Sequence, residues 1–514
     1  MEEVYDYAII GCGITGAYLG YKLNMLCPNK KFLFIEKKNY IGGRLLSIDG
    51  PRNDNNVKYE LGGMRHFECI HPLVTSLAKE LNVESSEFPE TIPGNIIELR
   101  SNTMTNDELS FKDIYFDETT VALFGKVNDI IEKLLKDQGF TDLDYALRTV
   151  KGRRELFENK ALANSDVQTT LMNPGGLNME EFQAYQDVVN YDNFFFEMSL
   201  CDAIGIIENL ALGGTSTCEQ KFMNGGYNLL AKNCIQKMKD TNPNVDVLLN
   251  SNLTSFNESG HHISLNVESN NNMKKYKAKQ LFLCVAYNDI QNVVNIPSTF
   301  ISNLNSNLTN LPLLKIFITF PSAFLNKRSG SQYDIQKGRN KCSNKLNQVW
   351  VYNDDPDNYT LMLYAINTNA NYWLNMLPSK EQITFVKAEE KYDTALNNIY
   401  YLLSQSFDIS IESIPQAKKI SYMYWNNGAA FWNARNKTTY NTNRDLTKTQ
   451  VELFHPFDSK KIVYLNNDIS FNQGWVEGSL EIVDTYLQDY KCSKESNKCD
   501  NSSNTSMKLI QRLL

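Results

Sequence analysis

The hydrophobic and polar positions at the start of the chain alternate between short apolar runs and a glycine-rich turn. An apolar run at residues 7–10 leads directly into Gly11, Gly13 and Gly16, and the apolar positions that follow have helical spacing. A second, mostly apolar run occupies residues 31–35. The pattern therefore predicts a strand, a tight turn, a helix and a second strand within the first 35 residues.

Similar patterns further along the chain predict more strands and a helical region. Residues 279–286 are predicted to form a strand, and their continuous apolar run from Leu281 to Ala286 is typical of a buried strand in a parallel sheet. Apolar positions recur at helical spacing through residues 110–200, most clearly at 127–135. Further strands are predicted at residues 247–250, 253–256, 313–320 and 347–366. Together these elements predict a mixed α/β fold, α+β overall, with a helical lobe.

The glycine spacing at the first turn is typical of a dinucleotide-binding site. The first glycine allows the turn, the second lets a pyrophosphate approach the backbone, and the third lets helix and strand pack closely. Glu36 ends the second strand about twenty residues later, where an acid can bind ribose hydroxyls. The alternative is a simple turn followed by a solvated glutamate. The motif alone leaves FAD and NAD both open.

Length and charge limit the class of protein. A chain of 514 residues suggests two domains, and its net charge of −8 provides no broad basic surface for nucleic acid or an anionic membrane. The acidic N-terminus differs from a basic secretory signal, and no apolar run approaches the roughly 18 residues of a membrane helix. We therefore expect a cytoplasmic protein with neither a membrane nor nucleic acid as its partner.

The ten cysteines are spaced singly, apart from Cys492 and Cys499 near the C-terminus. This spacing indicates neither a disulfide framework nor a metal site. We expect mostly reduced thiols and no bound metal.

The segments after Glu36 resemble the flavin-dependent amine oxidases. Residues 36–44 match the family's Glu-x-x-x-x-x-Gly-Gly-Arg pattern, and residues 59–65 resemble its next block, which runs beneath the flavin ring. Residues 222–230 resemble a further glycine-glycine turn of the family. Residues 463–479 resemble its closing FAD segment, except that Asn467-Asp468 stands where the family usually has Gly-Glu. The blocks occur in the family's order, separated along nearly the whole chain.

The resemblance implies a Rossmann-like FAD-binding domain of the glutathione-reductase and amine-oxidase type. It would be built from residues 1–80, 215–300 and 450–490. An inserted substrate-binding domain, with a mixed sheet and the helical lobe, would comprise residues 81–214 and 301–449. Residues 491–514 are rich in Ser, Asn and Lys and are expected to form a disordered tail.

The resemblance also implies that FAD is held noncovalently, because residues 425–432 have no cysteine where monoamine oxidases tether their flavin. Arg44 would bind the pyrophosphate through two parallel hydrogen bonds. The residues implied to bind FAD are Gly11, Gly13, Ile14, Thr15, Gly16, Glu36, Lys37, Gly43, Arg44, Gly62, Gly63, Met64, Arg65, Leu253, Asp468, Gly474, Trp475 and Val476.

Four residues are expected to perform or orient the chemistry. Lys315 interrupts an apolar strand and resembles the family lysine that holds a water near flavin N5, although a lysine reaching solvent is the alternative. Arg65 resembles the arginine with which L-amino-acid oxidases hold the substrate carboxylate, the alternative being a bond to the pyrophosphate or a nearby acid. Tyr364 resembles the tyrosine that binds the same carboxylate, and Trp475 resembles an aromatic wall beside the amine; simple packing is the alternative for both.

Among the histidines, His66 is the one expected near the site, in a structural role, and no protein general base is assigned.

The sequence thus predicts an FAD-dependent amine oxidoreductase that deaminates an L-amino acid. Its partners would be the amine or amino-acid substrate and molecular oxygen, its products a keto acid, ammonia and hydrogen peroxide, and a homodimer is possible. Two alternatives stay open. The first is a polyamine or monoamine oxidase, or another flavin oxidoreductase of the same fold. The second is a flavoprotein with a structural or packaging role.

Overall fold

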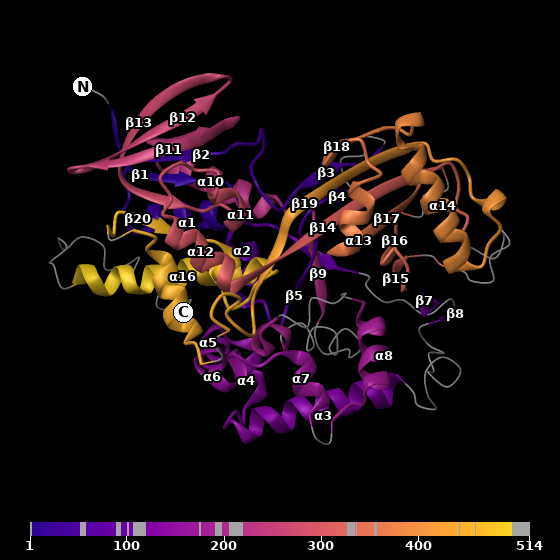
Figure 1. Ribbon diagram of the computed structural model, residues 1–514. Coiled ribbons are helices and arrows are strands. Elements are labelled where there is room, and N and C mark those ends of the chain that lie inside the picture. Colours follow the sequence, from indigo (N-terminus) through magenta and orange to yellow (C-terminus); the bar gives the residue numbers. More distant parts are fainter. Residues whose placement is uncertain are drawn as a thin grey trace.

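The computed structural model describes residues 3–51, 58–88, 94–99, 102–105, 120–173, 176–190, 198–204, 219–325, 335, 337–353, 357–440, 443–457 and 459–495. Two large sheets lie side by side, and a group of helices lies below them in the view of Figure 1. The mixed α/β fold class is therefore confirmed. The first sheet draws its strands from three separate segments of the chain. The domain boundaries given above remain a prediction.

The first sheet contains the predicted strand, turn and helix unit. Its strands follow the order β10-β2-β1-β13-β12-β11, with β20 paired to β13, and β1 lies parallel to both β2 and β13. The apolar runs are buried as their pattern indicates, since every residue of β2 is buried. The bounds are β1 Val4–Ile10, β2 Phe32–Ile35, β10 Val245–Leu248, β11 Ser251–Ser259, β12 His262–Ser269, β13 Asn272–Leu283 and β20 Ile462–Tyr464.

Helix α1 (Ile14–Leu26) packs against α10 (Leu229–Thr241) and α16 (Val476–Glu495), and α16 also packs against α2 (Pro72–Glu80). These helices cover the parallel part of the first sheet (Figure 1). The predicted tail is helical as far as Glu495, and the remainder lies outside the described residues. The remaining short elements near this sheet are α11 Tyr287–Ile290, α12 Ser298–Asn307, α15 Leu446–Phe454 and η5 Asn467–Ile469.

The second sheet has two faces of different composition. Its order is β18-β19-β14-β17-β16-β15-β7-β8. Leu314, Leu361 and Val349 belong to a large core that α13 and α14 cover, whereas Phe317, Met362 and Trp350 belong to a smaller core with Tyr59 and Leu61. The bounds are β7 Ile96–Leu99, β8 Asn102–Thr105, β14 Leu308–Phe320, β15 Gly338–Cys342, β16 Gln348–Asn353, β17 Tyr359–Ile366, β18 Glu381–Lys387, β19 Lys419–Trp432, α13 Thr368–Leu374, η3 Glu390–Tyr392, α14 Asp393–Phe407 and η4 Ile411–Ser413.

The helical lobe and two small sheets complete the fold. The lobe contains α3 Thr120–Asp137, α4 Leu143–Arg148, α5 Val150–Glu158, α6 Lys160–Ala163, α7 Val167–Met172 and α8 Met179–Val189. The small sheets are β3 (Ser47–Asp49) with β4 (Lys58–Glu60), and β5 (His66–Phe67), β9 (Gln220–Met223) and β6 (Ser85–Glu87). Both small sheets adjoin the predicted flavin-facing block at residues 59–65 in the sequence.

The cysteines differ from the expectation at one position. Among the cysteines that the structure describes, six are free thiols, namely Cys12, Cys27, Cys201, Cys234, Cys284 and Cys342. Cys69 is disulfide-bonded and is therefore an exception to the mostly reduced thiols expected from the sequence. Within the described ranges, every helix is too short or too polar to cross a membrane.

Candidate cofactor and substrate site

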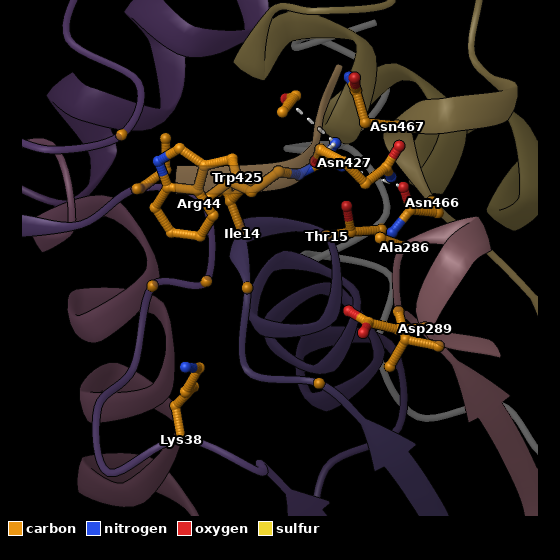
Figure 2. Close-up of a pocket in the computed structure, with 18 of the residues that line it drawn as sticks. Ile14, Thr15, Lys38, Arg44, Ala286, Asp289, Trp425, Asn427, Asn466 and Asn467 are labelled. Atoms are coloured by element: carbon orange, nitrogen blue, oxygen red, sulfur yellow. Dashed lines mark hydrogen bonds between the residues drawn. The ribbon is translucent and has the colours of Figure 1, made fainter. Parts of the chain in front are cut away.

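A cavity of about 850 Å³ lies between the two sheets. Its lining begins at the glycine turn of the first sheet and ends at strands β14, β17 and β19 of the second. In Figure 2, Ile14, Thr15 and Arg44 lie along this lining, and Lys38 lies away from Trp425. One continuous space therefore joins the predicted nucleotide site to the predicted substrate site.

The glycine turn matches the shape that a pyrophosphate requires. A Cβ on Gly16 would stand 2.1 Å from the carbonyl oxygen of Gly11, so only glycine lets the helix approach the strand there. A Cβ on Gly13 would meet no protein atom closer than 3.9 Å, and Gly13 lines the cavity. Its side-chain position is thus a cradle that a ligand can fill. Helix α1 begins here without a side-chain cap, so its first N–H groups face the same space.

Glu36 is buried at the edge of this cradle. Its carboxylate accepts hydrogen bonds from the backbone N–H of Cys12 (2.8 Å) and of Lys38 (2.9 Å). Burial nevertheless raises the pKa of Glu36. The neighbouring Lys37 forms an ion pair with Asp289 at 2.7 Å. Both members of that pair are about half exposed, so it contributes little to stability.

Arg44 is bound to the closing segment of the chain. Its guanidinium donates to the carboxylate of Asp468 at 3.0 Å and to the side-chain oxygen of Asn466 at 3.1 Å. The fully buried Asp468 also accepts from the backbone N–H of Tyr287 and from the amide of Asn427. Asp468 therefore joins Arg44, the start of α11 and strand β19 through its own hydrogen bonds.

Asn427 contributes an atom that suits a cofactor. Its amide nitrogen is bound to Asp468, but its Oδ1 is buried and has no hydrogen-bond partner. Asn427 lines the cavity beside Arg44 (Figure 2). An unused buried acceptor beside an open cradle fits a ligand that carries N–H or O–H donors, such as FAD. The sequence analysis did not single out Asn427, because a lone asparagine in a strand provides no signal.

Asn467, which stands where the family usually has glycine, has a structural role. The Asn467 side chain donates to the carbonyl of Trp475 (2.7 Å) and accepts from the backbone N–H of Gly474 (3.0 Å). Asn467 is buried, and its amide holds the turn that carries Trp475. The side chain that replaces the family's usual glycine thus fixes one wall of the cavity.

Lys315 lies on β14 at the opposite end of the cavity from Glu36. Its ammonium nitrogen donates to the carbonyls of Glu60 (3.0 Å) and Gly62 (2.5 Å), in the block predicted to run beneath the flavin. Burial lowers the pKa of Lys315, while burial raises the pKa of its neighbour Glu60. The lysine is therefore not a strand-edge residue that reaches solvent, since only 4% of it is exposed.

Three aromatic side chains line the substrate end. Tyr364 is the cross-strand partner of Lys315, whose nitrogen lies 5.2 Å from the tyrosine ring centroid. Trp425 donates its indole N–H to the carbonyl of Leu61 at 2.7 Å. Trp475 lines the same space. The end of the cavity near Lys315 is thus lined by aromatic side chains.

Arg65 occupies a different position from the one expected. Its guanidinium packs over the rings of Trp350 (5.5 Å) and Phe88 (5.7 Å). It is absent from the cavity lining, although its charge lies close enough to contribute to the lowered pKa of Lys315.

The cavity brings together most of the residues expected at the site. Those that line it are Gly11, Gly13, Ile14, Thr15, Glu36, Lys37, Gly43, Arg44, Gly62, Gly63, Leu253, Lys315, Tyr364, Gly474, Trp475 and Val476. Those that do not are Gly16, Met64, Arg65 and Asp468. Among the residues that the sequence analysis did not select, Tyr40, Ser251, Asp289, Trp425 and Asn427 line it as well.

Two buried histidines, His66 and His71, lie near the part of the cavity that Trp475 lines. His66 accepts or donates a hydrogen bond with the Tyr227 hydroxyl at 2.7 Å, and burial lowers its pKa to about 4. His71, which was not expected near the site, packs against Trp475. Burial also lowers the pKa of His71, so both rings are neutral near pH 7.

Comparison with known proteins agrees with this geometry. The chain is 28% identical to an uncharacterized protein of Acanthamoeba polyphaga mimivirus, over 94% of this chain and 93% of that one. It is 24% identical to Aplysianin-A of Aplysia kurodai, over 96% and 92%. Its fold is similar to that of cyclohexylamine oxidase from Brevibacterium oxydans, with a TM-score of 0.65 at 13% identity, covering 96% of this chain and 100% of that one.

Residues 25–386 match the family described as flavin containing amine oxidoreductase, a span that takes in the Gly-Gly-Arg segment, the Gly-Gly-Met-Arg block and Lys315. The chain belongs to this family of flavin-dependent amine oxidoreductases.

Proposed function

We propose that this protein binds FAD noncovalently and oxidises the amino group of an L-amino acid. The observation that carries the proposal is the position of Lys315, which faces the same cavity as the glycine turn and is bound to the carbonyls of Glu60 and Gly62. The products would be a keto acid, ammonia and hydrogen peroxide.

Several features of the cavity support noncovalent FAD. The open cradle at Gly13 and the uncapped start of α1 suit a pyrophosphate, and the unused Oδ1 of Asn427 suits a donor of the cofactor. Among the described lining residues the one cysteine is Cys284, which lies beside Gly11 at the nucleotide end. A thiol there is distant from the aromatic end at which the flavin ring would react.

A bound FAD supplies the acceptor for a hydride from the carbon that bears the amine. Residues of the chain would orient that carbon. Trp475, Tyr364 and Lys315 line the cavity and would contact the substrate there. Because burial lowers the pKa of Lys315 to about 7, its neutral form is reached much closer to neutral pH than for a free lysine, and that form can accept a hydrogen bond from a water molecule. The oxidised substrate would be an imine, which water would hydrolyse to the keto acid and ammonia, and oxygen would accept the two electrons together with two protons to give hydrogen peroxide.

The amino-acid assignment depends on a group that recognises the carboxylate. Tyr364 lines the cavity next to Lys315, and Arg65 lies close enough to influence the charge of Lys315. A guanidinium behind this wall would stabilise a carboxylate at the substrate end.

The test is anaerobic mixing of the FAD-reconstituted protein with a panel of L-amino acids and with cyclohexylamine and putrescine. Bleaching of the flavin absorbance by amino acids, with peroxide formed when oxygen is admitted, is the expected result. Arg65→Ala should raise KM for amino acids far more than for simple amines. Absence of flavin bands after reconstitution would overturn the proposal, and a flavin that no substrate bleaches would favour the structural role.

A simple amine without a carboxylate is the second candidate, and one observation favours it. Of the two arginines considered, Arg65 is absent from the cavity lining, and Arg44, which does line it, is bound to Asp468 and Asn466. Bleaching by cyclohexylamine or putrescine but by no amino acid would select this candidate.

A further inference from the structure

The amide of Asn427 is buried and half used. Its Nδ2 donates a hydrogen bond to the carboxylate of Asp468 at 2.8 Å, and only 9% of the residue is exposed. Because a carboxylate accepts hydrogen bonds, Asp468 determines that the NH₂ end of the amide faces it and that the oxygen end faces away. That oxygen, Oδ1, is buried and has no hydrogen-bond partner. Asn427 itself lines the cavity, so a ligand there can supply the missing donor.

An irregularity in strand β19 brings Asn427 to the cavity. The register of β14 and β19 shifts at this point, and residues 426–428 of β19 stand opposite Pro312 of β14 alone. Proline has no N–H to donate to the ladder, and bulges of this kind redirect side chains beside functional sites. The guanidinium of Arg44 donates to the bulge instead, at 3.4 Å from the carbonyl oxygens of Asn427 and Gly428.

The contacts around Asn427 extend towards both parts of the predicted FAD site. On one side Arg44, which contacts the Asn427 carbonyl, directly follows the glycine that faces the Gly13 cradle. On the other side Trp425, two residues before Asn427, donates to the carbonyl of Leu61 in the block predicted to run beneath the flavin. The part of FAD that joins its pyrophosphate to its flavin ring is the ribityl chain. This chain carries hydroxyl groups, which can donate hydrogen bonds.

Asp468, which the sequence analysis expected to contact FAD, does not reach the cavity. It is fully buried and absent from the cavity lining, and its carboxylate also accepts from Arg44 (3.0 Å) and from the backbone N–H of Tyr287 (2.9 Å). Asn427 is the residue that connects this acid to the cavity wall. The negative charge at its NH₂ end polarises the amide and makes Oδ1 a stronger acceptor for a neutral hydroxyl.

We propose that Asn427 is a cofactor-binding residue whose Oδ1 accepts a hydrogen bond from a ribityl hydroxyl of FAD. This inference rests on the FAD binding of the proposed function and assigns the part of the cofactor that β19 contacts.

The experiment measures Kd by isothermal titration calorimetry, with the full-length apoprotein and with FAD or FAD analogues that each lack one ribityl hydroxyl. The wild type is compared with Asn427→Ala and with Asn427→Ser, whose hydroxyl still provides a donor for the Asp468 carboxylate and so protects the fold. Adenosine diphosphate, which has the pyrophosphate but neither the ribityl chain nor the flavin, is the control ligand.

One analogue should bind the wild type about tenfold more weakly than FAD does. Both variants should bind FAD and that analogue with equal Kd, because the hydroxyl and its acceptor then no longer interact. Adenosine diphosphate should bind all three proteins with the same Kd.

Two results would overturn the inference. The first is that every analogue binds the wild type as tightly as FAD does. The second is that the variants bind FAD, the analogues and adenosine diphosphate more weakly by one common factor, which would mean that Asn427 only holds Asp468. The measurement does not depend on turnover, so a protein that binds FAD but oxidises no amino acid still decides this inference, whereas a wild-type protein that binds no FAD overturns the proposed function with it.

Discussion

The indole ring of Trp475 packs against the imidazole ring of His71, with ring centroids 4.8 Å apart. His71 is fixed in turn, because its Nδ1 accepts a hydrogen bond from the backbone N–H of Phe67 at 3.0 Å. Two residues beyond Trp475, Glu477 accepts from the backbone N–H groups of Leu73 and Val74, both at 2.9 Å, and so binds the start of α2. The cavity wall at Trp475 is thus supported by the segment from β5 to the start of α2.

We predict that His71→Leu raises KM severalfold and lowers the free energy of unfolding by about 2 kcal/mol, because Trp475 loses its support and the Phe67 N–H loses its acceptor. Steady-state kinetics and denaturant unfolding measure the two effects. His71→Asn separates them, since the amide oxygen can replace Nδ1 but provides no ring. It should restore most of the stability while KM stays high, and His261→Leu at an exposed position is the control. A wild-type KM in His71→Asn would show that the ring does not position Trp475.

Asn467 provides a second prediction, in which a return to the family pattern is harmful. Asn467→Gly removes the two hydrogen bonds that hold Gly474 and Trp475. We expect a loss of about 2 kcal/mol in stability and weaker flavin retention. The measurements are the unfolding free energy and the flavin absorbance per polypeptide after gel filtration. Tighter flavin binding in Asn467→Gly would instead mean that the asparagine obstructs the cofactor.

The sequence was most informative where a motif depends on backbone shape. The glycine spacing and Glu36 can be recognised without the fold, because their roles follow from local turn geometry and from the end of one strand. Lys315 was recognisable as a charge within an apolar strand. For these residues the resemblance and the observed cavity agree on position.

Residues whose roles depend on tertiary contacts could not be predicted. Asn427 is distinguished by an unused hydrogen-bonding atom, which no pattern along the chain can reveal. His71 follows Arg65 by only six positions but faces Trp475, whereas the Arg65 side chain packs on Trp350. Adjacency in the sequence does not fix side-chain direction, so the expected carboxylate contact of Arg65 could not be established from its motif.

The glycine turn allows folding and cofactor binding to be separated. Gly13→Ala places a methyl group in open space, where the nearest protein atom is 3.9 Å away, so the apoprotein should have a wild-type melting temperature. The same methyl group would occupy the cofactor cradle, and flavin content should fall by at least about tenfold. Gly16→Ala brings its Cβ within 2.1 Å of the Gly11 carbonyl and should destabilise the apoprotein itself. Wild-type flavin content in a folded Gly13→Ala protein would contradict the assignment of the cradle.

Three buried acids, Asp202, Glu477 and Glu481, lead to a prediction about how stability depends on pH. Burial raises the pKa of Asp202 and Glu477 to about 8 and that of Glu481 to about 7. The folded state therefore binds these protons more tightly than the unfolded state, whose carboxyl groups titrate near pH 4. The stabilisation that they provide is complete below pH 4 and is lost as the pH rises towards 8. We expect the free energy of unfolding to be at least about 2 kcal/mol lower at pH 8.5 than at pH 6.

Asp202 accepts a hydrogen bond from the backbone N–H of Trp432. Asp202→Asn retains an acceptor there while removing one titrating carboxyl group. This variant should have a shallower decrease in stability with pH, measured by urea unfolding at each pH, and an unchanged slope would exclude Asp202 as a source of the pH dependence.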